Sequence, residues 1–382
     1  MTPDYTAMSD AEFRALIRDF VETEYPDIPR FPLERLHWDV VKPWYLKLSQ
    51  RGFLCPTWPV DRGGMGLTAA KHLIMVEELE RFGAARVHDI GPVMLGPLLL
   101  KYGTEAQKDH FLPRILSGEH VWAQGYSEPG AGSDLAAVRC EAVQQGGDWV
   151  INGQKTWTTL GMDANWIFIL ARTDKTVKKQ AGISFLLVPM DAPGVSTRNI
   201  LNLSGEAEFC EVFFDDVRVP LDHIVGEVNQ GWTAAKALLG HERVFIGAPR
   251  LSASALARLE HLARHMGQWS DPVFRDRFVA LRCDVLDLGD LFQTYLDRLR
   301  DGTEIGADVA MLKVFQSELY QRISDLTMEV AGPASGLRHP PQGDRRLHAA
   351  ATYLSARPVT IFGGSTEILR NVLARAVLGL PG

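Results

Sequence analysis

Apolar residues recur at helical spacing in the first third of the chain. Ser9 to Glu12 is a plausible helix start, and a capping-box-like start at Thr104 begins a further helix that ends near Gly118. A loop rich in Pro and Gly, residues 56–66, interrupts this pattern. We therefore predict an N-terminal helical domain over residues 1–118. Its first helix buries apolar residues three and four apart: Phe13, Leu16, Ile17, Phe20 and Val21.

Strand-like runs replace the helical period after residue 119. Asn152-Gly153 lies between two such runs and tolerates the positive φ angles of a type I′ turn, so we predict a hairpin there. Short apolar or β-branched runs at 166–171, 183–188 and 210–214 are bounded by Gly, Pro and Asp, which is typical of strands. The sequence predicts a middle all-β domain, a barrel or sandwich, over residues 119–228.

The helical period returns at Gly231 and continues to the C-terminus. Antiparallel helices of this length form a four-helix bundle, which we predict over residues 229–382. The fold class is therefore α+β multidomain, in the order helical domain, β domain, helical bundle. Four long segments carry the helical pattern: roughly 231–268, 272–300, 304–331 and 344–378.

Composition limits the classes of function. A chain of 382 residues is long for one core and agrees with several domains. The net charge of −7, without a basic cluster among aromatics, argues against nucleic-acid binding. The most apolar window, 90–100, is broken by Gly and Pro and is too short to span a membrane. The four cysteines form no Cys-x-x-Cys pair, so we expect no metal site. The N-terminus shows no signal peptide, so we expect a cytoplasmic protein.

The stretch from Gly125 to Asp134 reads Gly-Tyr-Ser-Glu-Pro-Gly-Ala-Gly-Ser-Asp. Its three glycines and its proline exclude a helix interior or a central strand. The backbone N–H groups of such a loop, with the hydroxyls of Ser127 and Ser133, can bind an anionic group such as a pyrophosphate. It is neither a Walker A loop nor the Gly-x-Gly-x-x-Gly of a Rossmann turn. A plain surface turn has the same composition, so both interpretations stay open on these residues alone.

Glu242 interrupts the apolar stripe of the helix predicted at the start of the bundle. A carboxylate in such a stripe is costly unless it has a partner or a function. Burial raises the pKa of a carboxyl group toward the range that a general base needs. An ion pair with a distant Lys or Arg, or exposure near Gly240, explains the same pattern. Residues three and four apart share a helical face, which groups Glu242 with Leu238, Leu239, Phe245 and Ile246.

Four segments together carry a family resemblance. They are Tyr126 to Asp134, Asn152 to Thr159, Glu211 to Pro220, and Ile361 to Arg370. In this order and spacing the chain resembles an acyl-CoA dehydrogenase over nearly its full length. The resemblance implies FAD, an acyl-CoA substrate and α,β-dehydrogenation to the trans-2-enoyl-CoA: a carboxylate removes the α proton while flavin N5 accepts the β hydride.

The same resemblance implies roles for individual residues. Trp157 corresponds to a residue that packs on the isoalloxazine, although alone it reads as an ordinary aromatic of a sheet core. The hydroxyl of Thr159 is expected near flavin N5. Ser133, Arg243 and Gly363 are expected at the substrate. The residues expected to bind FAD are Tyr126, Ser127, Gly132, Ser133, Trp157, Thr158, Thr159, Arg264, Ser365 and Glu367.

The family places its catalytic base at one of two positions. In the C-terminal segment the corresponding residue here is Gly363, which carries no acid. The other position lies on the first bundle helix immediately before an arginine, and Glu242-Arg243 matches that pattern. The resemblance and the apolar stripe thus point to the same residue, and we expect Glu242 to be the base. The N–H group of Gly363 is expected to polarise the thioester carbonyl.

One segment departs from the family pattern. The family's Arg-x-x-Phe-Gly, which reaches the FAD of a neighbouring subunit, corresponds to residues 263–272, where the Phe is missing and Arg264 is displaced by about one position. We expect a homotetramer, or a heterotetramer with a related subunit, and electron-transferring flavoprotein as the electron acceptor. The alternatives are one subunit of a heteromeric dehydrogenase that shares a FAD site, or an acyl-CoA oxidase or flavin monooxygenase on the same fold.

Overall fold

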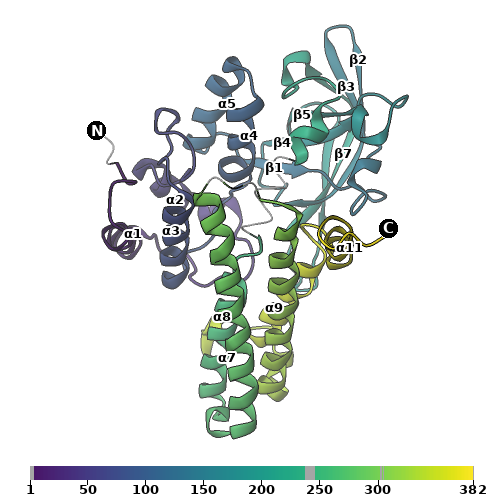
Figure 1. The fold of residues 1–382 in the computed structure, drawn as a ribbon. Coiled ribbons are helices and arrows are strands. Elements are labelled where there is room, and N and C mark those ends of the chain that lie inside the picture. Colours follow the sequence, from purple (N-terminus) through teal and green to yellow (C-terminus); the bar gives the residue numbers. More distant parts are fainter. Residues whose placement is uncertain (1–3, 237–245, 302, 304, 382) are drawn as a thin grey trace. The chain divides into compact units, whose positions relative to one another are not determined.

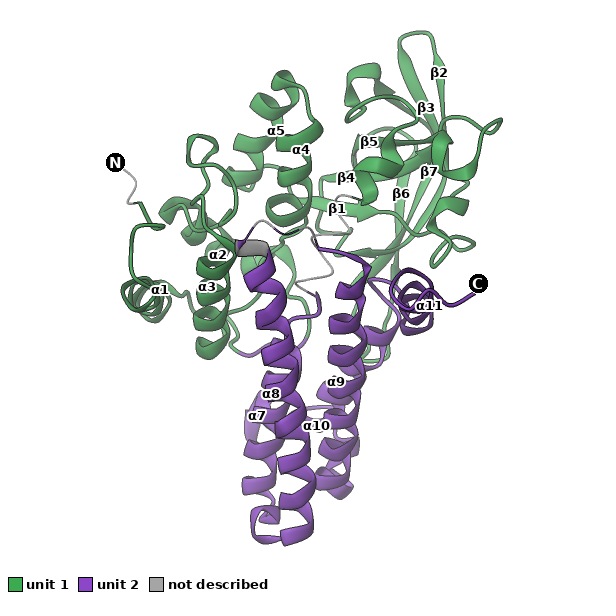
Figure 2. Cartoon of the chain, in the orientation of Figure 1, with its two compact units in different colours: residues 1–30, 34–238 green, residues 31–33, 239–382 purple. Residues whose placement is uncertain are grey.

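The computed structural model describes residues 4–236, 246–301, 303 and 305–381. The chain forms two compact units, which Figure 2 distinguishes by colour. The first comprises residues 1–30 and 34–238, and the second comprises residues 31–33 and 239–382. The first unit contains the N-terminal helices and the sheet, and the second contains the C-terminal helices (Figure 1).

The N-terminal part of the first unit is helical, as predicted. Both expected helix starts are confirmed, because Ser9 and Thr104 each form a full capping box with the residue three positions later. A single π-helical turn, Ile90–Leu95, leads directly into α4. The helices are α1 (Asp10–Glu24), α2 (Trp38–Arg51), α3 (Ala69–Phe82), α4 (Gly96–Tyr102) and α5 (Glu105–Ser117).

A buried carboxylate joins α1 to α3. Glu78 of α3 accepts hydrogen bonds from Arg14 and Arg18 of α1 and from Arg81 of its own helix, at 2.8–3.1 Å. The hydrogen bonds, Arg18 foremost, lower the pKa of Glu78 to about 2. This carboxylate is therefore a structural ion-pair centre, and we assign it no catalytic role.

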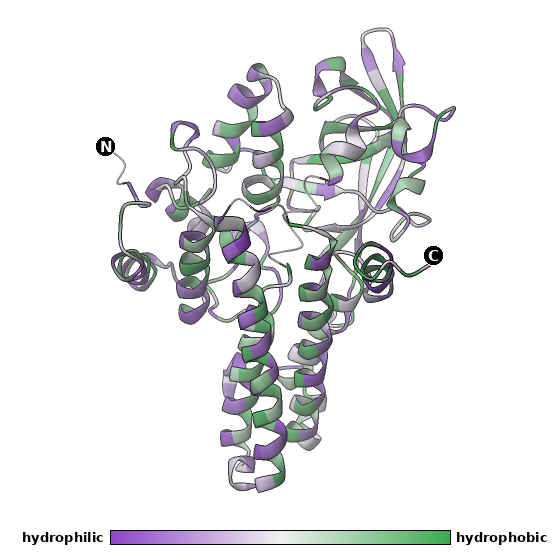
Figure 3. Cartoon of the chain, in the orientation of Figure 1, coloured by the Kyte–Doolittle hydropathy of each residue, from purple (hydrophilic) through white to green (hydrophobic). Residues whose placement is uncertain are grey.

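All seven strands of the middle part belong to one sheet, which confirms the all-β domain. The strand order is β1-β4-β2-β3-β7-β6, and β5 pairs with β4. β4 and β5 are almost entirely buried, and both are apolar along most of their length (Figure 3). The strands are β1 (Trp122–Gly125), β2 (Glu141–Gln145), β3 (Asp148–Thr159), β4 (Trp166–Arg172), β5 (Ile183–Pro189), β6 (Val195–Ile200) and β7 (Phe209–Pro220).

The predicted hairpin at Asn152-Gly153 is wrong. β3 continues through both residues, and the pairing with β7 shifts there from Ile151–Val217 to Gly153–Phe214. β7 carries one extra residue there and forms a bulge with Asp216 at φ 51°, and Asn152 exchanges two 2.9 Å hydrogen bonds with Asp216. The Asn-Gly pair therefore stabilises a bulge between β3 and β7, because its hydrogen-bonding partner is a residue 64 positions away.

The second unit is a helical bundle with α9 at its centre. α7, α8, α10 and α11 all contact α9. The fourth predicted segment, 344–378, is not one helix, because Pro358 and the positive-φ pair Gly363-Gly364 separate α10 from α11. The helix in the third predicted segment, 304–331, begins at residue 310. The helices are α7 (Arg250–His265), α8 (Pro272–Arg300), α9 (Ala310–Ala331), α10 (Ala349–Ala356) and α11 (Thr366–Ala376).

Candidate functional site

The glycine-rich loop that follows β1 is held in place by backbone hydrogen bonds. Glu128 and Ala131 exchange two N–H···O bonds of 3.0 Å, which close a tight turn over Pro129-Gly130. The N–H of Thr156 donates to the carbonyl of Ser127 at 2.9 Å and so ties the loop to β3. The turn is thus part of a rigid framework, unlike a freely moving surface turn.

A buried ion pair between Lys155 and Glu128 supports this loop, and the sequence did not indicate it. Lys155 of β3 is fully buried, and its Nζ donates to Glu128 at 2.7 Å and to the carbonyls of Leu170 and Tyr126 at 2.6 and 3.3 Å. All three ammonium hydrogens thus have acceptors. The Glu128 carboxylate also accepts from the N–H groups of Arg139 and Cys140 at 2.6 and 3.0 Å. The residues beside Lys155, Gln154 and Thr156, are polar, so the sequence gives no signal of its burial.

The loop leaves its backbone accessible at the two glycines after Pro129. Neither Gly130 nor Gly132 has a positive φ angle, and a Cβ added at either would meet nothing within 4 Å. The loop's own fold therefore does not require glycine there. Bare N–H groups beside open space suit the close approach of an anionic group. Ser133 is exposed and Ser127 is half-buried at the same loop.

Tyr126 has a different setting from the rest of the loop. Its ring is buried and makes edge contacts with Phe168 and Phe185, with centroid separations of 5.7 and 6.4 Å. Its side chain therefore anchors the start of the loop in the core of the first unit. The proposed contact between Tyr126 and FAD stays a prediction.

Trp157 lies on a bulge of β3 and faces outward. The pairing of β3 with β7 shifts between Lys155–Val212 and Thr158–Cys210, so β3 carries one extra residue. Trp157 has φ 60°, a left-handed conformation that costs a non-glycine residue about 1–2 kcal/mol. Its indole is 60% exposed and makes an edge contact with Phe209. A strained backbone that presents a large aromatic ring to the outside is typical of a ligand-binding position.

The two threonines after Trp157 end the strand. Thr158 is buried, and among the described residues its hydroxyl has no hydrogen-bond partner. A buried polar atom of this kind fits a bound polar ligand. Thr159 is half-buried and pairs with Phe209 of β7. Trp157 thus faces outward at the end of β3, while the next residue, Thr158, is buried on the other side of the strand.

In the second unit, the loop of residues 361–365 precedes α11. Ser365 is the N-cap of α11, and its hydroxyl accepts from the N–H of Ile368 at 3.4 Å. Glu367 is exposed in the first turn, where its own backbone N–H and the Ser365 hydroxyl lower its pKa. Both side chains thus have local helix-capping roles, and their contact with FAD stays a prediction.

The backbone conformation of Gly363 favours glycine. Its φ angle is 66°, and a Cβ there would lie 2.8 Å from Cδ1 of Ile246. An acidic side chain at this position would therefore strain the backbone and displace Ile246. The same contact brings Gly363 beside the residue that directly follows the stretch 237–245. Glu242 and Arg243 belong to that stretch and lie outside the described residues.

Arg264 has partners on the surface of the second unit. Its guanidinium donates to Glu260, one turn earlier on α7, at 2.6 and 3.0 Å. It also lies over the ring of Trp269, 4.1 Å from the centroid. These contacts account for Arg264 within this chain, and its predicted contact with FAD is untested.

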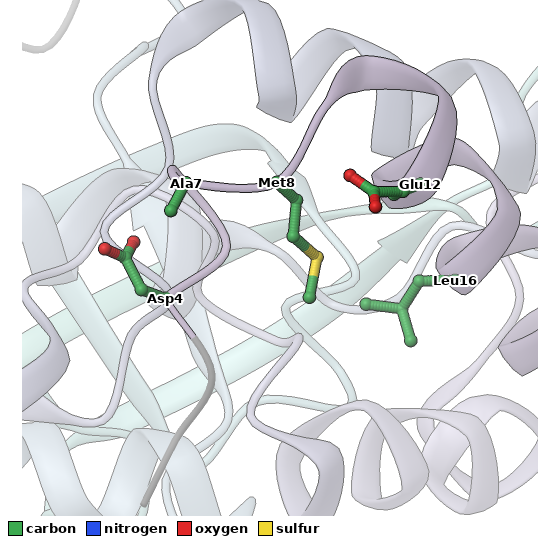
Figure 4. Close-up of a pocket in the computed structure, with 5 residues that line it drawn as sticks. All are labelled: Asp4, Ala7, Met8, Glu12 and Leu16. Carbon is green, nitrogen blue, oxygen red and sulfur yellow. The ribbon is translucent and has the colours of Figure 1, made fainter.

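A surface pocket near the N-terminus is lined by Asp4, Ala7, Met8, Glu12 and Leu16 (Figure 4). Its two carboxylates are engaged locally, Asp4 with Thr6 and Glu12 with Ser9. Among the described residues, no group of three or more His, Cys, Asp or Glu side chains could hold a metal ion. None of the described helices combines the length and apolar character needed to cross a membrane.

Comparison with known families accounts for most of the chain. The family model of the acyl-CoA dehydrogenase N-terminal domain matches residues 9–119. The model of the middle domain matches residues 123–217, and that of the C-terminal domain matches residues 229–378. These ranges lie close to the predicted domains 1–118, 119–228 and 229–382, whose exact boundaries stay a prediction.

Individual relatives cover similar lengths. The chain is 40% identical over 348 residues to the acyl-CoA dehydrogenase IpdE1 of Mycobacterium tuberculosis. The aligned region covers 88% of this chain and 87% of IpdE1. It is 30% identical to a chain of the ChsE4–ChsE5 complex from Mycobacterium tuberculosis, with a TM-score of 0.86 and coverage of 98% and 97%. It is 29% identical to a chain of the Tcur3481–Tcur3483 steroid acyl-CoA dehydrogenase, with a TM-score of 0.89 and 97% of each chain covered.

Proposed function

This chain belongs to the acyl-CoA dehydrogenase family and is an oxidoreductase, and we propose that it binds FAD and oxidises an acyl-CoA thioester to the trans-2-enoyl-CoA. Electrons then pass to electron-transferring flavoprotein. The structural relative that is named a steroid acyl-CoA dehydrogenase favours a steroid-derived acyl group as substrate.

The observation that carries the proposal is the outward-facing Trp157 on the bulge of β3. A water-exposed indole held at φ 60° has no evident benefit for the folded chain alone. It gains a purpose if a flat aromatic ligand stacks on it. The open glycine loop and the buried hydroxyl of Thr158 supply the polar groups that such a ligand also needs.

The residues of this chain fit FAD. The N–H groups at Gly130 and Gly132, with Ser127 and Ser133, would bind the pyrophosphate. Trp157 would pack on the isoalloxazine, with Thr158 and Thr159 donating to its polar edge; Tyr126, Arg264, Ser365 and Glu367 complete the proposed set. Bound FAD supplies the acceptor for the hydride that leaves the β carbon.

Glu242 and Gly363 are the two residues that we assign to the removal of the α proton. Glu242 removes the α proton, and Arg243 with Ser133 helps to hold the acyl-CoA. The N–H of Gly363 donates to the thioester carbonyl oxygen, which stabilises the negative charge that develops there as the α proton leaves. A glycine at 363 leaves no acid at the family's other base position, which is why we assign the base to Glu242.

The test is the visible absorption spectrum of the purified chain, followed by anaerobic addition of acyl-CoAs. We expect about one FAD per chain and bleaching of the flavin by at least one straight, branched, dicarboxylic or steroid-derived acyl-CoA. A FAD-loaded protein that no acyl-CoA bleaches would contradict the dehydrogenase proposal. Rapid reaction of the reduced protein with oxygen would instead favour an acyl-CoA oxidase or flavin monooxygenase.

The variant Trp157→Gly distinguishes a contribution of Trp157 to FAD binding from a contribution to the stability of the folded protein. We expect the dissociation constant for FAD to rise about 10- to 100-fold, because the stacking surface is lost. The stability of the FAD-free protein should change by less than about 1 kcal/mol, since relief of the positive φ offsets the greater freedom of glycine in the unfolded chain. Isothermal titration and chemical unfolding measure the two quantities.

Trp157→Phe is the matched variant, because it keeps an aromatic face at the same position. It should bind FAD within about tenfold of the wild type. Equal FAD affinity in Trp157→Gly and the wild type would remove Trp157 from the proposed cofactor site.

A second candidate function is one subunit of a heteromeric dehydrogenase. It is favoured by Arg264, whose guanidinium is engaged by Glu260 and Trp269 of its own chain. Two structural relatives are described as paired proteins, ChsE4–ChsE5 and Tcur3481–Tcur3483. A FAD-saturated, active homotetramer of this chain alone would exclude the heteromeric alternative. A colourless protein that gains FAD only with a related subunit would support it.

A further inference from the structure

Lys313 is a buried cation that the proposed function does not yet use. It lies on α9, and its side chain is fully buried. Its Nζ donates to the carbonyl oxygen of Gly364 at 2.8 Å. Burial lowers the pKa of Lys313 to about 8, while Glu367 of α11 and Glu318 of α9 oppose that shift. Burying an ammonium group is costly, so the contact between the Lys313 ammonium group and the carbonyl of Gly364 needs an explanation.

The loop that Lys313 contacts is conformationally unusual. Gly363 and Gly364 have φ angles of 66° and 95°, and two successive glycines give the backbone the greatest freedom available to it. The ends of the loop are fixed: the N–H groups of Ile361 and Phe362 donate to Pro358, and Ser365 caps α11. The Gly363-Gly364 turn between those ends needs a separate constraint, and the ammonium group of Lys313 provides one.

The same turn of α9 also contacts the segment that follows residues 237–245. A Cβ at Gly247 would lie 2.4 Å from Cβ of Leu312 and 3.1 Å from the backbone nitrogen of Lys313. Ile246 in turn lies against Gly363. Lys313 is thus located where the loop of Gly363 and the segment after Glu242 both meet α9.

We propose that Lys313 is a positioning residue, which fixes the Gly363-Gly364 turn through the Gly364 carbonyl and so aims the Gly363 N–H at the thioester carbonyl oxygen. This rests on the proposed function. An oxyanion donor is effective only when its direction is set before the reaction, because reorientation during the reaction costs rate. Loss of the anchor should therefore lower kcat more than it raises KM.

The experiment compares Lys313→Met with the wild-type holoenzyme in two measurements. Hydrogen–deuterium exchange without substrate should accelerate about tenfold in the amides of residues 361–369, with α9 unchanged. Dehydrogenation of an accepted acyl-CoA should show kcat reduced about tenfold and KM within about twofold, at unchanged FAD content.

Gln316→Met is the matched control. Gln316 is buried on the same helix, three residues from Lys313, and its substitution also removes a buried polar side chain. It should leave both the exchange of residues 361–369 and kcat unchanged. An equal effect in the two variants would show a general disturbance of α9 and overturn the proposal.

Three other outcomes also overturn it: unchanged loop exchange in Lys313→Met, faster loop exchange with unchanged kcat, or a fall in kcat that follows loss of FAD. A wild-type protein that no acyl-CoA reduces refutes the proposed function instead. In that case the exchange measurement still decides whether Lys313 holds the turn, so the two failures are distinguishable.

Discussion

Replacing Glu242 with glutamine is expected to leave FAD bound and to slow flavin reduction by acyl-CoA about 10²- to 10⁴-fold. Glutamine keeps the size of the side chain but cannot accept the α proton, and general bases contribute factors of this order. Because the amide removes only the proton acceptor, KM should change little. Anaerobic stopped-flow absorbance of the flavin measures the rate of reduction directly.

The control is Glu206→Gln, at an exposed position between β6 and β7. It should reduce flavin at the wild-type rate. Glu242→Gln with full activity would exclude Glu242 as the base, and loss of FAD in that variant would give it a structural role instead. The pH profile adds a second criterion: the limb that reports deprotonation of the base should disappear in Glu242→Gln only.

The fold was predictable where local signals and tertiary contacts agree. Ser9 and Thr104 start helices with capping boxes because the N-cap and N3 residues satisfy each other's backbone groups without help from elsewhere. At Asn152-Gly153 the local signal and the tertiary contacts disagree, and the predicted hairpin is wrong. Its local preference for a turn was overridden by the pairing of β3 with β7 and by hydrogen bonds from Asn152 to Asp216.

The candidate site was predictable at the level of segments and less so at the level of side chains. The glycine loop and Trp157 were identified, and the structure adds the bulge and the positive φ that turn Trp157 outward. Lys155 and Lys313 were missed, because a lysine side chain is usually exposed to solvent. Their burial depends on acceptors far along the chain: Glu128 for one and the Gly364 carbonyl for the other.

Replacing Lys155 with methionine is expected to lower the free energy of unfolding by about 3–5 kcal/mol, because it leaves the buried Glu128 carboxylate without its cation. Chemical unfolding monitored by tryptophan fluorescence measures this loss. FAD affinity should fall as well, since Glu128 also holds the N–H groups of Arg139 and Cys140 and the turn to Ala131.

Lys179→Met is the matched control, because Lys179 pairs with Asp134 at the end of the same loop, at 2.9 Å, with both side chains about 60% exposed. An exposed pair contributes at most about 1 kcal/mol, so this variant should be close to the wild type in stability. The contrast isolates burial as the cause, since each substitution removes one ammonium group that pairs with a carboxylate of the same loop. If the two variants lose equal stability, the loop is not held by the buried pair. The rigidity that we assign to the glycine loop would then need another source.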